Sequence, residues 1–566
     1  MKFDEILQYL GEFGFYQKKI YFILCFMGTT TMFHMVAQVF LAPSIDHWCK
    51  APQLDQQNCS LWQGIDEETC NALKYNATIP EDDSGTILRE NQCRRCNVTY
   101  SEFDVHTERC QLSDQNLQEC GDGWEYDHSQ YKATVVEDFD LVCDDGSKAS
   151  LAQSIYFGGV LIGSLLFGAM ADYIGRKSTM FICIFITLVF SIAVMFSPGY
   201  WWFTMLRAVV GCANIGIYLM AFTLSTEIVG PSKRTFVGIV LNFYIAVGIM
   251  ICGLLAYFIR DWRWLQLAIS VPNIFYFFIY PIIPESPRWL ISQKRFDEAE
   301  AIIMECARVN KVDNLPPDIL DEEKAKVEPD VIYSIADLFR TPNMRKKTIN
   351  ILYNWMVNSL VYYGLSLGTS SLGGRDYLAF ILSGAVEVPS FIIALPAMNK
   401  YGRRPVLCVF MVLGGVACFT SIWVPIGWAR TTVSLIGKFG IAASFAIIYV
   451  FSAELYPTPI RSAGMGTASM TARIGGILAP IILEIGKLWR PLPLIIFSLM
   501  SISAGLLALL LPETLNKNLP ETIEEGEAFG KKIPTVQQEI KPTMVDYSGQ
   551  VDMESTFTNK ACDIKE

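Results

Sequence analysis

The segment Gly168–Lys177, which reads GAMADYIGRK, occurs a second time in a weaker form as Leu395–Arg404, LPAMNKYGRR. The two copies lie 227 residues apart, and each falls between long runs of apolar residues. A polar turn that recurs at a fixed distance between apolar runs is typical of a chain with two related sets of membrane spans. We therefore expect two homologous membrane-embedded halves.

Two further motifs keep nearly the same spacing. The segment Ser225–Arg234, STEIVGPSKR, returns 227 residues later as Ser452–Arg461, SAELYPTPIR. The Pro-Glu pair at positions 284 and 285 returns at positions 512 and 513, which is 228 residues later. Three polar motifs in one register indicate an internal duplication of the whole span pattern.

The composition is that of a membrane protein. Hydrophobic residues make up 52% of the 566 residues, charged residues only 18%, and the mean hydropathy is +0.31. A soluble globular domain carries about 25% charged residues. The formal net charge is −11, and its acidic excess lies mainly between residues 46 and 148, so the composition argues against nucleic-acid binding.

Runs with little or no charge, each long enough to cross a membrane as a helix, occur twelve times. They cover residues 20–42, 149–171, 179–206, 208–226, 235–259, 264–283, 348–374, 377–398, 405–428, 431–453, 462–483 and 491–511. A helix satisfies its own backbone hydrogen bonds in lipid. We therefore predict an all-α membrane protein of twelve transmembrane helices in two six-helix repeats.

Lysine and arginine flank alternate loops, and this bias predicts that those loops and both termini are cytoplasmic. The expected organisation is a cytoplasmic N-terminus (1–19), a first half (20–283), a cytoplasmic helical linker (284–347), a second half (348–511) and a polar, disordered cytoplasmic tail (512–566). Apolar residues spaced for one face predict an amphipathic helix over 295–308 in the linker.

A large polar insertion, residues 43–148, separates the first two spans and is expected to be extracellular. It contains eight cysteines, which predict a small disulfide-rich domain whose pairing stays open: Cys49, Cys59, Cys70, Cys93, Cys96, Cys110, Cys120 and Cys143. It also holds three glycosylation sequons, at Asn58, Asn76 and Asn97. A zinc site at the Cys93-x-x-Cys96 pair is the weaker alternative, because no second such pair accompanies it.

Several motifs together resemble one transporter family. They are GAMADYIGRK, STEIVGPSKR, DWRWLQ, PESPRWL, IGK, AELYPTPIR, ARIGGILAP and LPETLN. In this order they resemble the organic cation, anion and zwitterion transporter family of the major facilitator superfamily, and the second half is most similar to its organic cation and carnitine members. The large cysteine-rich outer loop also looks like that of this family. One departure is Asn399, which stands where the first repeat has Asp172.

Three charged residues interrupt apolar spans of the second half, namely Glu387, Lys438 and Arg473. A charge inside a span costs several kcal/mol and usually faces a cavity or a partner, so each is a candidate for substrate binding. The alternative is that they neutralise one another as buried structural pairs. Arg473 could hold a carboxylate by a two-pronged hydrogen bond, and Glu387 could attract an ammonium.

The resemblance adds two expectations about the substrate. In the family, the position of Arg473 tends to be Asp in dedicated cation transporters and Arg in anion and carnitine-type members, which favours a substrate with a carboxylate. The family's cavity is lined by the spans that hold the aromatic candidates Tyr218, Trp355, Tyr362 and Phe445, whose faces could attract an amine, although packing or lipid contact would explain any one of them equally well.

The repeated loop motifs place charges at cytoplasmic span ends, where ion pairs can form and break. The resemblance implies a cytoplasmic gate of Asp172, Arg176, Glu227, Arg234, Glu285, Arg288, Arg403, Glu454 and Arg461, with Glu513 as a further candidate. A static role at the membrane surface is the alternative.

Function follows from the spans, the intramembrane charges and the resemblance. We expect a secondary carrier that moves small organic cations or zwitterions across the plasma membrane by alternating access, with an organic anion exchanger as the alternative and a transport-inactive receptor as a weaker one. Sodium coupling, proton coupling and uncoupled transport stay open. The sequence has no phosphate-binding loop, metal-ligand cluster or nucleophile and base pair, so neither an enzyme nor a bound cofactor or metal is expected.

Overall fold

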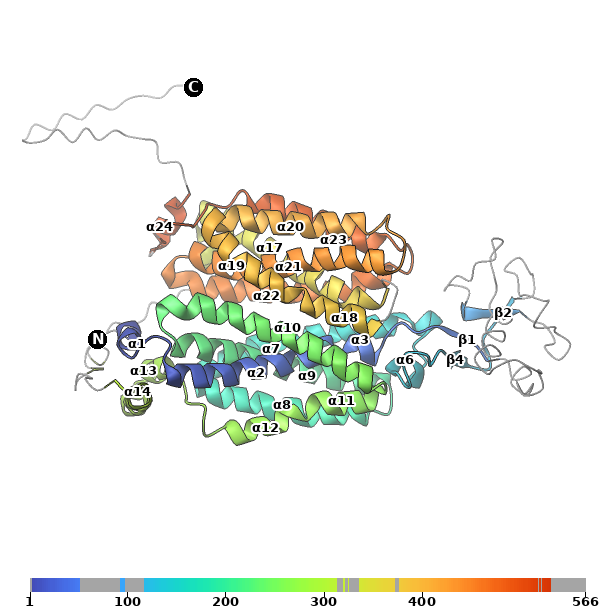
Figure 1. Ribbon diagram of the computed structural model, residues 1–566, viewed down its shortest axis with the longest axis horizontal. Coiled ribbons are helices and arrows are strands. Elements are labelled where there is room, and N and C mark those ends of the chain that lie inside the picture. The colour runs from blue at the N-terminus through green and yellow to red at the C-terminus, as the bar shows by residue number, and fades with distance from the viewer. Residues whose placement is uncertain are drawn as a thin grey trace, which may run out of the picture. The chain divides into compact units, whose positions relative to one another are not determined.

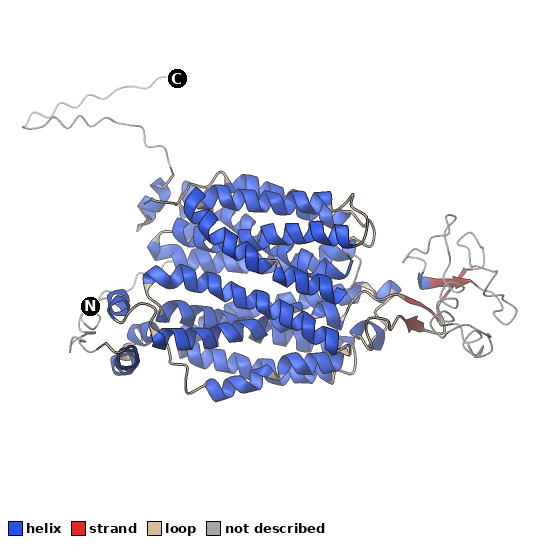
Figure 2. Ribbon diagram, in the orientation of Figure 1, coloured by secondary structure: helices blue, strands red, loops and turns tan. Residues whose placement is uncertain are grey.

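The computed structural model describes residues 3–50, 92–96, 117–312, 319–320, 324, 335–371, 376–517, 519–520 and 522–530. Long helices form two groups that follow the sequence repeat. In Figure 1 the helices of the first half, in blue to green, lie together below those of the second half, in yellow to red. Strands occur beside one end of the helices, as Figure 2 shows.

Among the described residues, the first group is formed by eight helices. They are α2 (Phe15–Val36), which continues through Ala37 into α3 (Gln38–Leu41), α7 (Ser147–Ile174), α8 (Arg176–Met195), α9 (Tyr200–Ile228), α10 (Arg234–Phe258), α11 (Trp262–Ser270) and α12 (Pro272–Ile279). The helix over the last predicted span of this half is interrupted at Val271, because Pro272 has no N–H to continue the hydrogen-bond ladder.

The second group repeats this plan. Its helices are α17 (Pro342–Leu367), α18 (Asp376–Ala385), α19 (Glu387–Tyr401), α20 (Arg403–Thr420), α21 (Trp428–Leu455), α22 (Arg461–Ile485) and α23 (Leu492–Ala508). Helices therefore lie over all twelve predicted runs, with Val386 joining α18 and α19 into one span.

Within the described residues, nine helical segments are long and apolar enough to span a membrane by length and composition alone. The three remaining runs fall short for separate reasons. The pair α11 and α12 is broken at Val271, and α23 has 17 residues. Helix α17 begins with the basic run 345–347 and carries Asn350, Asn354 and Asn358 along one face, which lowers its hydropathy.

Short amphipathic helices gather at one end of the first group. They are α1 (Phe3–Tyr9), α13 (Pro287–Ser292) and α14 (Phe296–Asn310), which matches the amphipathic helix expected over 295–308. Ala299 and Ile303 of α14 are buried in an apolar cluster with residues of α1 and α13. Asn310 ties this layer to α2, because its Nδ2 donates to Gln17 Oε1 at 2.8 Å.

A comparable layer covers the second group at the same end. Helix α24 (Ile523–Ala528) lies at the start of α17, where Glu527 accepts hydrogen bonds from the backbone N–H groups of Asn343 and Met344. Lys347 donates from Nζ to the carbonyl of Gly526 at 2.8 Å. Unsatisfied N–H groups at a helix start favour an acidic partner, so α24 caps α17. Figure 1 shows α24 and α1 at the same end, which we name the α24 end.

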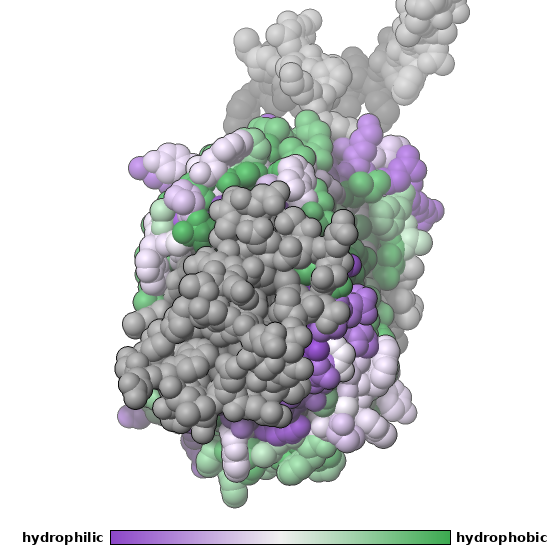
Figure 3. All heavy atoms as spheres, turned by 90° about the vertical axis from the view of Figure 1, so that its right-hand side faces the viewer, coloured by the Kyte–Doolittle hydropathy of each residue, from purple (hydrophilic) through white to green (hydrophobic). Residues whose placement is uncertain are grey.

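At the opposite end, which is named the strand end, the described residues form four short strands. Strand β1 (His47–Cys49) pairs antiparallel with β4 (Trp124–Tyr126), and β2 (Arg94–Cys96) pairs antiparallel with β3 (Leu117–Glu119). Figure 3 views this end and shows hydrophilic side chains on several sides of the grey atoms, with hydrophobic ones toward the top and bottom of the view.

Two disulfides join the described parts of the cysteine-rich insertion. They are Cys49–Cys120 and Cys93–Cys143, so the predicted disulfide-bonded loop is confirmed for these four cysteines. Nε2 of His47 lies 3.6 Å from Cys143 Sγ. That sulfur is part of a disulfide, so it is not a thiolate that could bind a metal. Cys59, Cys70 and Cys110, and the sequons at Asn58, Asn76 and Asn97, lie outside the described residues.

Among the described residues, the hydrogen bonds between the two halves gather near the strand end. Ser150 on α7 donates to Glu484 on α22 at 2.7 Å, and Tyr131 donates to Asp376 at the start of α18 at 3.1 Å. Phe40 of α3 stacks on Tyr377, with ring centres 5.4 Å apart. At this end the two halves are in direct contact.

Candidate functional site

A cavity lies between the two halves, at about the middle of the helices. It encloses about 680 Å³ of space, part of it open to solvent. Helices α2, α9 and α10 of the first half and α17, α19, α21 and α22 of the second supply its walls. A mostly apolar cavity of this size with a few polar groups is the usual form of a small-molecule site.

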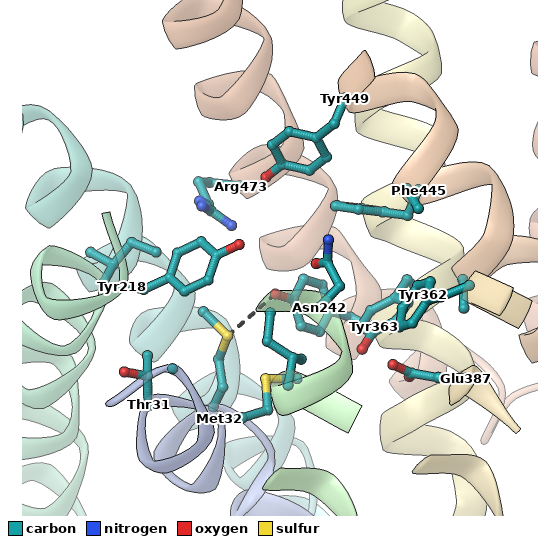
Figure 4. Close-up of a pocket in the computed structure, with 17 residues that line it drawn as sticks. Thr31, Met32, Tyr218, Asn242, Tyr362, Tyr363, Glu387, Phe445, Tyr449 and Arg473 are labelled. Atoms are coloured by element: carbon teal, nitrogen blue, oxygen red, sulfur yellow. Dashed lines mark hydrogen bonds between the residues drawn. The ribbon is translucent and has the colours of Figure 1, made fainter. Parts of the chain in front are cut away.

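Arg473 is the cationic group that lines the cavity. It comes from α22, its exposed fraction is 6%, and its Nε has no hydrogen-bond partner among the described residues. No carboxylate among the described residues lies within ion-pairing distance of its guanidinium. In Figure 4 the hydroxyl groups of Tyr218 and Tyr449 point toward it from opposite halves. A buried guanidinium without an acidic partner is costly, and a bound carboxylate would relieve that cost.

Glu387 also lines the cavity, but it already has a cationic neighbour. Its Oε1 lies 3.0 Å from Nζ of Lys438, and both side chains are almost fully buried. The distance is that of an ion pair, while neither oxygen of Glu387 receives a well-directed hydrogen bond from a described residue. At this distance the two charges act as a pair, and Oε2 keeps its capacity to accept a hydrogen bond.

Lys438 and Trp355, both predicted to bind the substrate, lie behind the wall of the cavity rather than in it. Lys438 Nζ sits over the Tyr362 ring, 3.1 Å from its centre, and Lys438 also donates to the hydroxyl of Ser366. Trp355 is fully buried, and its indole N–H donates to Ser452 at 2.9 Å. These two residues can support the wall, because the groups that line the cavity pack in front of them.

The other aromatic candidates line the cavity. Tyr218 comes from α9, Tyr362 from α17 and Phe445 from α21. The ring of Phe445 lies 5.7 Å from that of Tyr362 and 5.7 Å from that of Tyr449, centre to centre. The second half therefore presents a continuous aromatic wall beside Glu387.

Several lining residues were not singled out in the sequence. They include Tyr449, Tyr363, Asn242, Phe391, Met32 and Met35. Tyr449 stands one helical turn after Phe445, so an i, i+4 rule applied to the aromatic candidates would have found it. Tyr363 follows Tyr362 directly and donates to the sulfur of Met35 at 3.3 Å, a contact between the halves that no local pattern indicates.

The charged loop motif of the first half forms one connected group. Arg176 Nε lies 3.5 Å from Glu227, and its Nη2 lies 3.2 Å from Asp172, which is largely exposed. Glu285 accepts hydrogen bonds from the backbone N–H groups of Arg176 and Lys177. The group therefore joins the ends of α7, α8 and α9 to the segment after α12.

The second half repeats this group with a tighter ion pair. Arg403 makes two hydrogen bonds to Glu454, at 2.9 and 3.0 Å, and Glu513 accepts from the N–H groups of Arg403 and Arg404. Thr514 also donates to Glu454 at 2.6 Å. Asn399 occupies the position of Asp172, and Arg403 lies closer to Glu454 than Arg176 does to Glu227.

The remaining predicted gate residues lie apart from these ion pairs. Arg234 pairs with Asp4 of α1 at 2.6 Å, a partner outside the predicted set. Arg461 donates to the carbonyl of Tyr456, and Arg288 is exposed without an ion pair to a described residue. In this conformation the observed gate-motif ion pairs join residues of the same half.

Comparisons with known proteins agree with this architecture. Residues 102–525 match the model of the sugar (and other) transporter family. The chain is 40% identical over 543 residues to the "Organic cation transporter protein" of Drosophila melanogaster, covering 94% of this chain and 96% of that protein. It is 36% identical over 540 residues to the human "Organic cation/carnitine transporter 2", covering 92% and 93%.

A solved structure shows the same fold. The inward-open xylose transporter XylE of E. coli superposes with a TM-score of 0.55 at 18% identity, over 70% of this chain and 93% of that one. A match at this identity supports the major facilitator fold and nothing finer. With the repeated motifs, the two helix groups and relatives that are transporters and not enzymes, the chain belongs to the organic cation, anion and zwitterion transporter family of the major facilitator superfamily.

Proposed function

We propose that this transporter moves small zwitterions, which carry an amine and a carboxylate, by alternating access of its two halves. The observation that carries the proposal is Arg473, a buried guanidinium that faces the cavity without a described carboxylate partner. A substrate carboxylate would supply the missing counter-charge through two parallel hydrogen bonds. The name of the human relative includes carnitine, which is itself a zwitterion.

The amine of the substrate is assigned to the aromatic wall. Tyr362 and Phe445 line the cavity, and an aromatic ring face attracts an organic ammonium by about 0.5 to 2 kcal/mol. Oε2 of Glu387 adds a hydrogen-bond acceptor at the same wall. A molecule with its two charges at opposite ends would then extend from α22 toward α17 and α19.

The proposed conformational state rests on where the halves are in contact. Their hydrogen bonds gather near the strand end, which we place outside the cell, so this conformation corresponds to a cavity closed from the outside. The loop motifs would then exchange their pairs within a half for contacts between halves when the cavity faces outward. The plasma membrane is the proposed location, with both termini cytoplasmic.

The topology can be tested on intact cells. A glycosidase should increase gel mobility through the sequons at Asn58, Asn76 and Asn97, and an impermeant thiol reagent should label the insertion only after reduction. An unchanged mobility together with labelling before reduction would contradict the proposed orientation.

The substrate assignment is tested by uptake into expressing cells or proteoliposomes. The panel contains carnitine, β-alanine, a quaternary ammonium and a dicarboxylate, each with and without sodium. Arg473→Ala should lower zwitterion uptake at low concentration by about ten- to a hundredfold, because a charge-assisted fork is lost, while a permanent cation should lose much less. Arg473→Lys should restore only part of the loss.

An organic anion is the second candidate, because the charge of Arg473 has no described acidic partner. Dicarboxylate uptake above that of every zwitterion would favour it. Equal losses for cation and zwitterion in Arg473→Ala, at matched surface levels, would mean that Arg473 supports the helices and does not bind the ligand. Loss of uptake without sodium would assign sodium coupling, and dependence on a pH gradient would assign proton coupling.

A further inference from the structure

The ammonium of Lys438 occupies a place that chemically resembles an amine-binding site. Nζ lies 3.0 Å from Glu387 Oε1 and 3.1 Å from the centre of the Tyr362 ring. It donates to the hydroxyl of Ser366 and lies 3.4 Å from the carbonyl oxygen of Tyr362. A carboxylate, an aromatic face and neutral oxygens are the groups that commonly surround a bound organic ammonium.

The chain therefore supplies an ammonium group, that of Lys438, on the side of the aromatic wall that faces away from the cavity. Tyr362 and Glu387 both line the cavity, whereas Lys438 lies behind them. One face of the Tyr362 ring already carries a cation, which weakens the attraction of the ring for a second one. The same cation offsets the charge of Glu387.

The charge balance at the cavity follows directly. Glu387 contributes one negative charge, Lys438 one positive charge and Arg473 a second positive charge, so these three groups leave a formal charge of +1. Without Lys438 the same site would be formally neutral, with an unpaired carboxylate beside an aromatic wall. Low-dielectric surroundings make such differences large.

We infer that Lys438 is a tethered ammonium that sets substrate class, favouring molecules with a carboxylate over pure organic cations by neutralising Glu387. This inference rests on the proposed function, since it assumes that substrates bind in this cavity. It makes Lys438 a specificity-determining residue that acts through Glu387 and Tyr362 and does not touch the substrate.

A series of charge variants tests the inference. Glu387→Gln raises the formal charge of the site to +2, the double variant Glu387→Gln/Lys438→Met keeps it at +1, and Lys438→Met lowers it to 0. Lys438→Gln is a second neutral variant that can still donate to Ser366. Lys400→Met is the matched control, because Lys400 is an exposed lysine at the far end of α19.

The measurement is the ratio of uptake of a permanent organic cation, tetraethylammonium, to that of carnitine in the same cells. A ratio within one cell population cancels differences in surface level. Lys438→Met and Lys438→Gln should raise the ratio about tenfold or more, and Glu387→Gln should lower it. The Lys400→Met control and the double variant should stay within about threefold of the unmodified chain.

The double variant keeps the test decisive even where single variants misfold, because it removes both members of the buried ion pair and leaves neither one unpaired. A tenfold change of the ratio in the double variant would overturn the inference. The formal charge of the site is the same in that variant, so the ratio would then depend on Glu387 itself. Ratios unchanged in both neutral Lys438 variants would overturn it equally, and would leave Lys438 a purely structural residue.

The two proposals fail in different ways. If no member of the panel is transported, or if Arg473→Ala affects cation and carnitine alike, the proposed function fails. If carnitine uptake depends on Arg473 but the uptake ratio is unchanged in the neutral Lys438 variants, only the inference about Lys438 fails.

Discussion

The carboxylate of Glu285 accepts a hydrogen bond from the backbone N–H of Arg176 at 2.9 Å, and Glu513 makes the same contact with Arg403 at 2.9 Å in the second half. Each glutamate follows the last span of its half, and each arginine begins a helix. A carboxylate at a helix N-terminus satisfies free N–H groups and the helix dipole. The Pro-Glu motif therefore ties the sixth span of each half to its third.

Glycine is required immediately before each of these helix starts. Gly175 and Gly402 have φ values of +100° and +99°, and a Cβ on Gly175 would clash with Oε2 of Glu285. We expect Gly175→Ala to lose about 1 to 3 kcal/mol of stability and much of its surface expression. Fluorescence-detected thermal unfolding in detergent measures this. Gly168→Ala, in the same motif with open space around its Cβ, is the control and should behave like the unmodified chain.

The two loop motifs should differ in how strongly transport depends on their glutamate charge. Glu454 receives two hydrogen bonds of 2.9 and 3.0 Å from Arg403, whereas the Nε and Nη2 atoms of Arg176 each lie 3.5 Å from an oxygen of Glu227. Glu454→Gln should therefore lower the transport rate more than Glu227→Gln, by about three- to tenfold, with surface levels little changed. Initial uptake rates normalised to surface biotinylation report this difference. Normal rates in both variants would leave the motifs a static structural role.

The thiol of Cys306 reports whether α1 is docked. Burial raises the pKa of Cys306 to about 12, so at neutral pH the thiol is protonated and shielded within the cluster of α1, α13 and α14. Leu7→Asp places a charge in that cluster and should accelerate maleimide labelling of Cys306 about tenfold, measured by peptide mass spectrometry. Gln8→Asp changes the exposed face of α1 and should not. Equal labelling in both variants would show that α1 does not shield this thiol.

The disulfides of the insertion should stabilise the strand end. Removing Cys93–Cys143 with Cys93→Ser/Cys143→Ser should cost about 2 to 5 kcal/mol and reduce delivery to the cell surface, because a cross-link that restricts the unfolded chain is lost. Thermal unfolding with and without a reducing agent measures the loss. The reducing agent should lower the stability of the variant less than that of the unmodified protein, because the variant lacks this disulfide. Cys408→Ser, at a free buried cysteine of α20, is the control. Identical unfolding of the variant and the unmodified protein would contradict a stabilising role.

The spans and the repeat could be predicted because they depend on local features. Apolar runs, loop charges and the spacing of GAMADYIGRK are visible in one dimension, and helices follow from the need to satisfy backbone groups in lipid. The limits of helices were less predictable: α17 begins at Pro342, six residues before the apolar run, because polar turns extend a helix beyond the hydrocarbon.

The charged residues of the site could be predicted from the sequence, but the contacts between them could not. Glu387 and Arg473 stand out because each interrupts an apolar run, and both line the cavity. The contact of Glu387 with Lys438 joins α19 to α21, so it depends on packing between helices that no sequence period encodes. Tyr449 was missed because aromatic residues form 13% of the chain, and a single one carries little information.

The capping of α17 by α24 limits where a tag can be fused to, or residues deleted from, the C-terminal part of this protein. A reporter protein fused after residue 530 would leave in place Glu527 and its hydrogen bonds to Asn343 and Met344. A deletion that begins at residue 519 would strip the start of α17 of this acidic cap and remove the carbonyl that accepts from Lys347. Purification and imaging of this transporter therefore call for tags beyond α24, and for shortened chains that retain it.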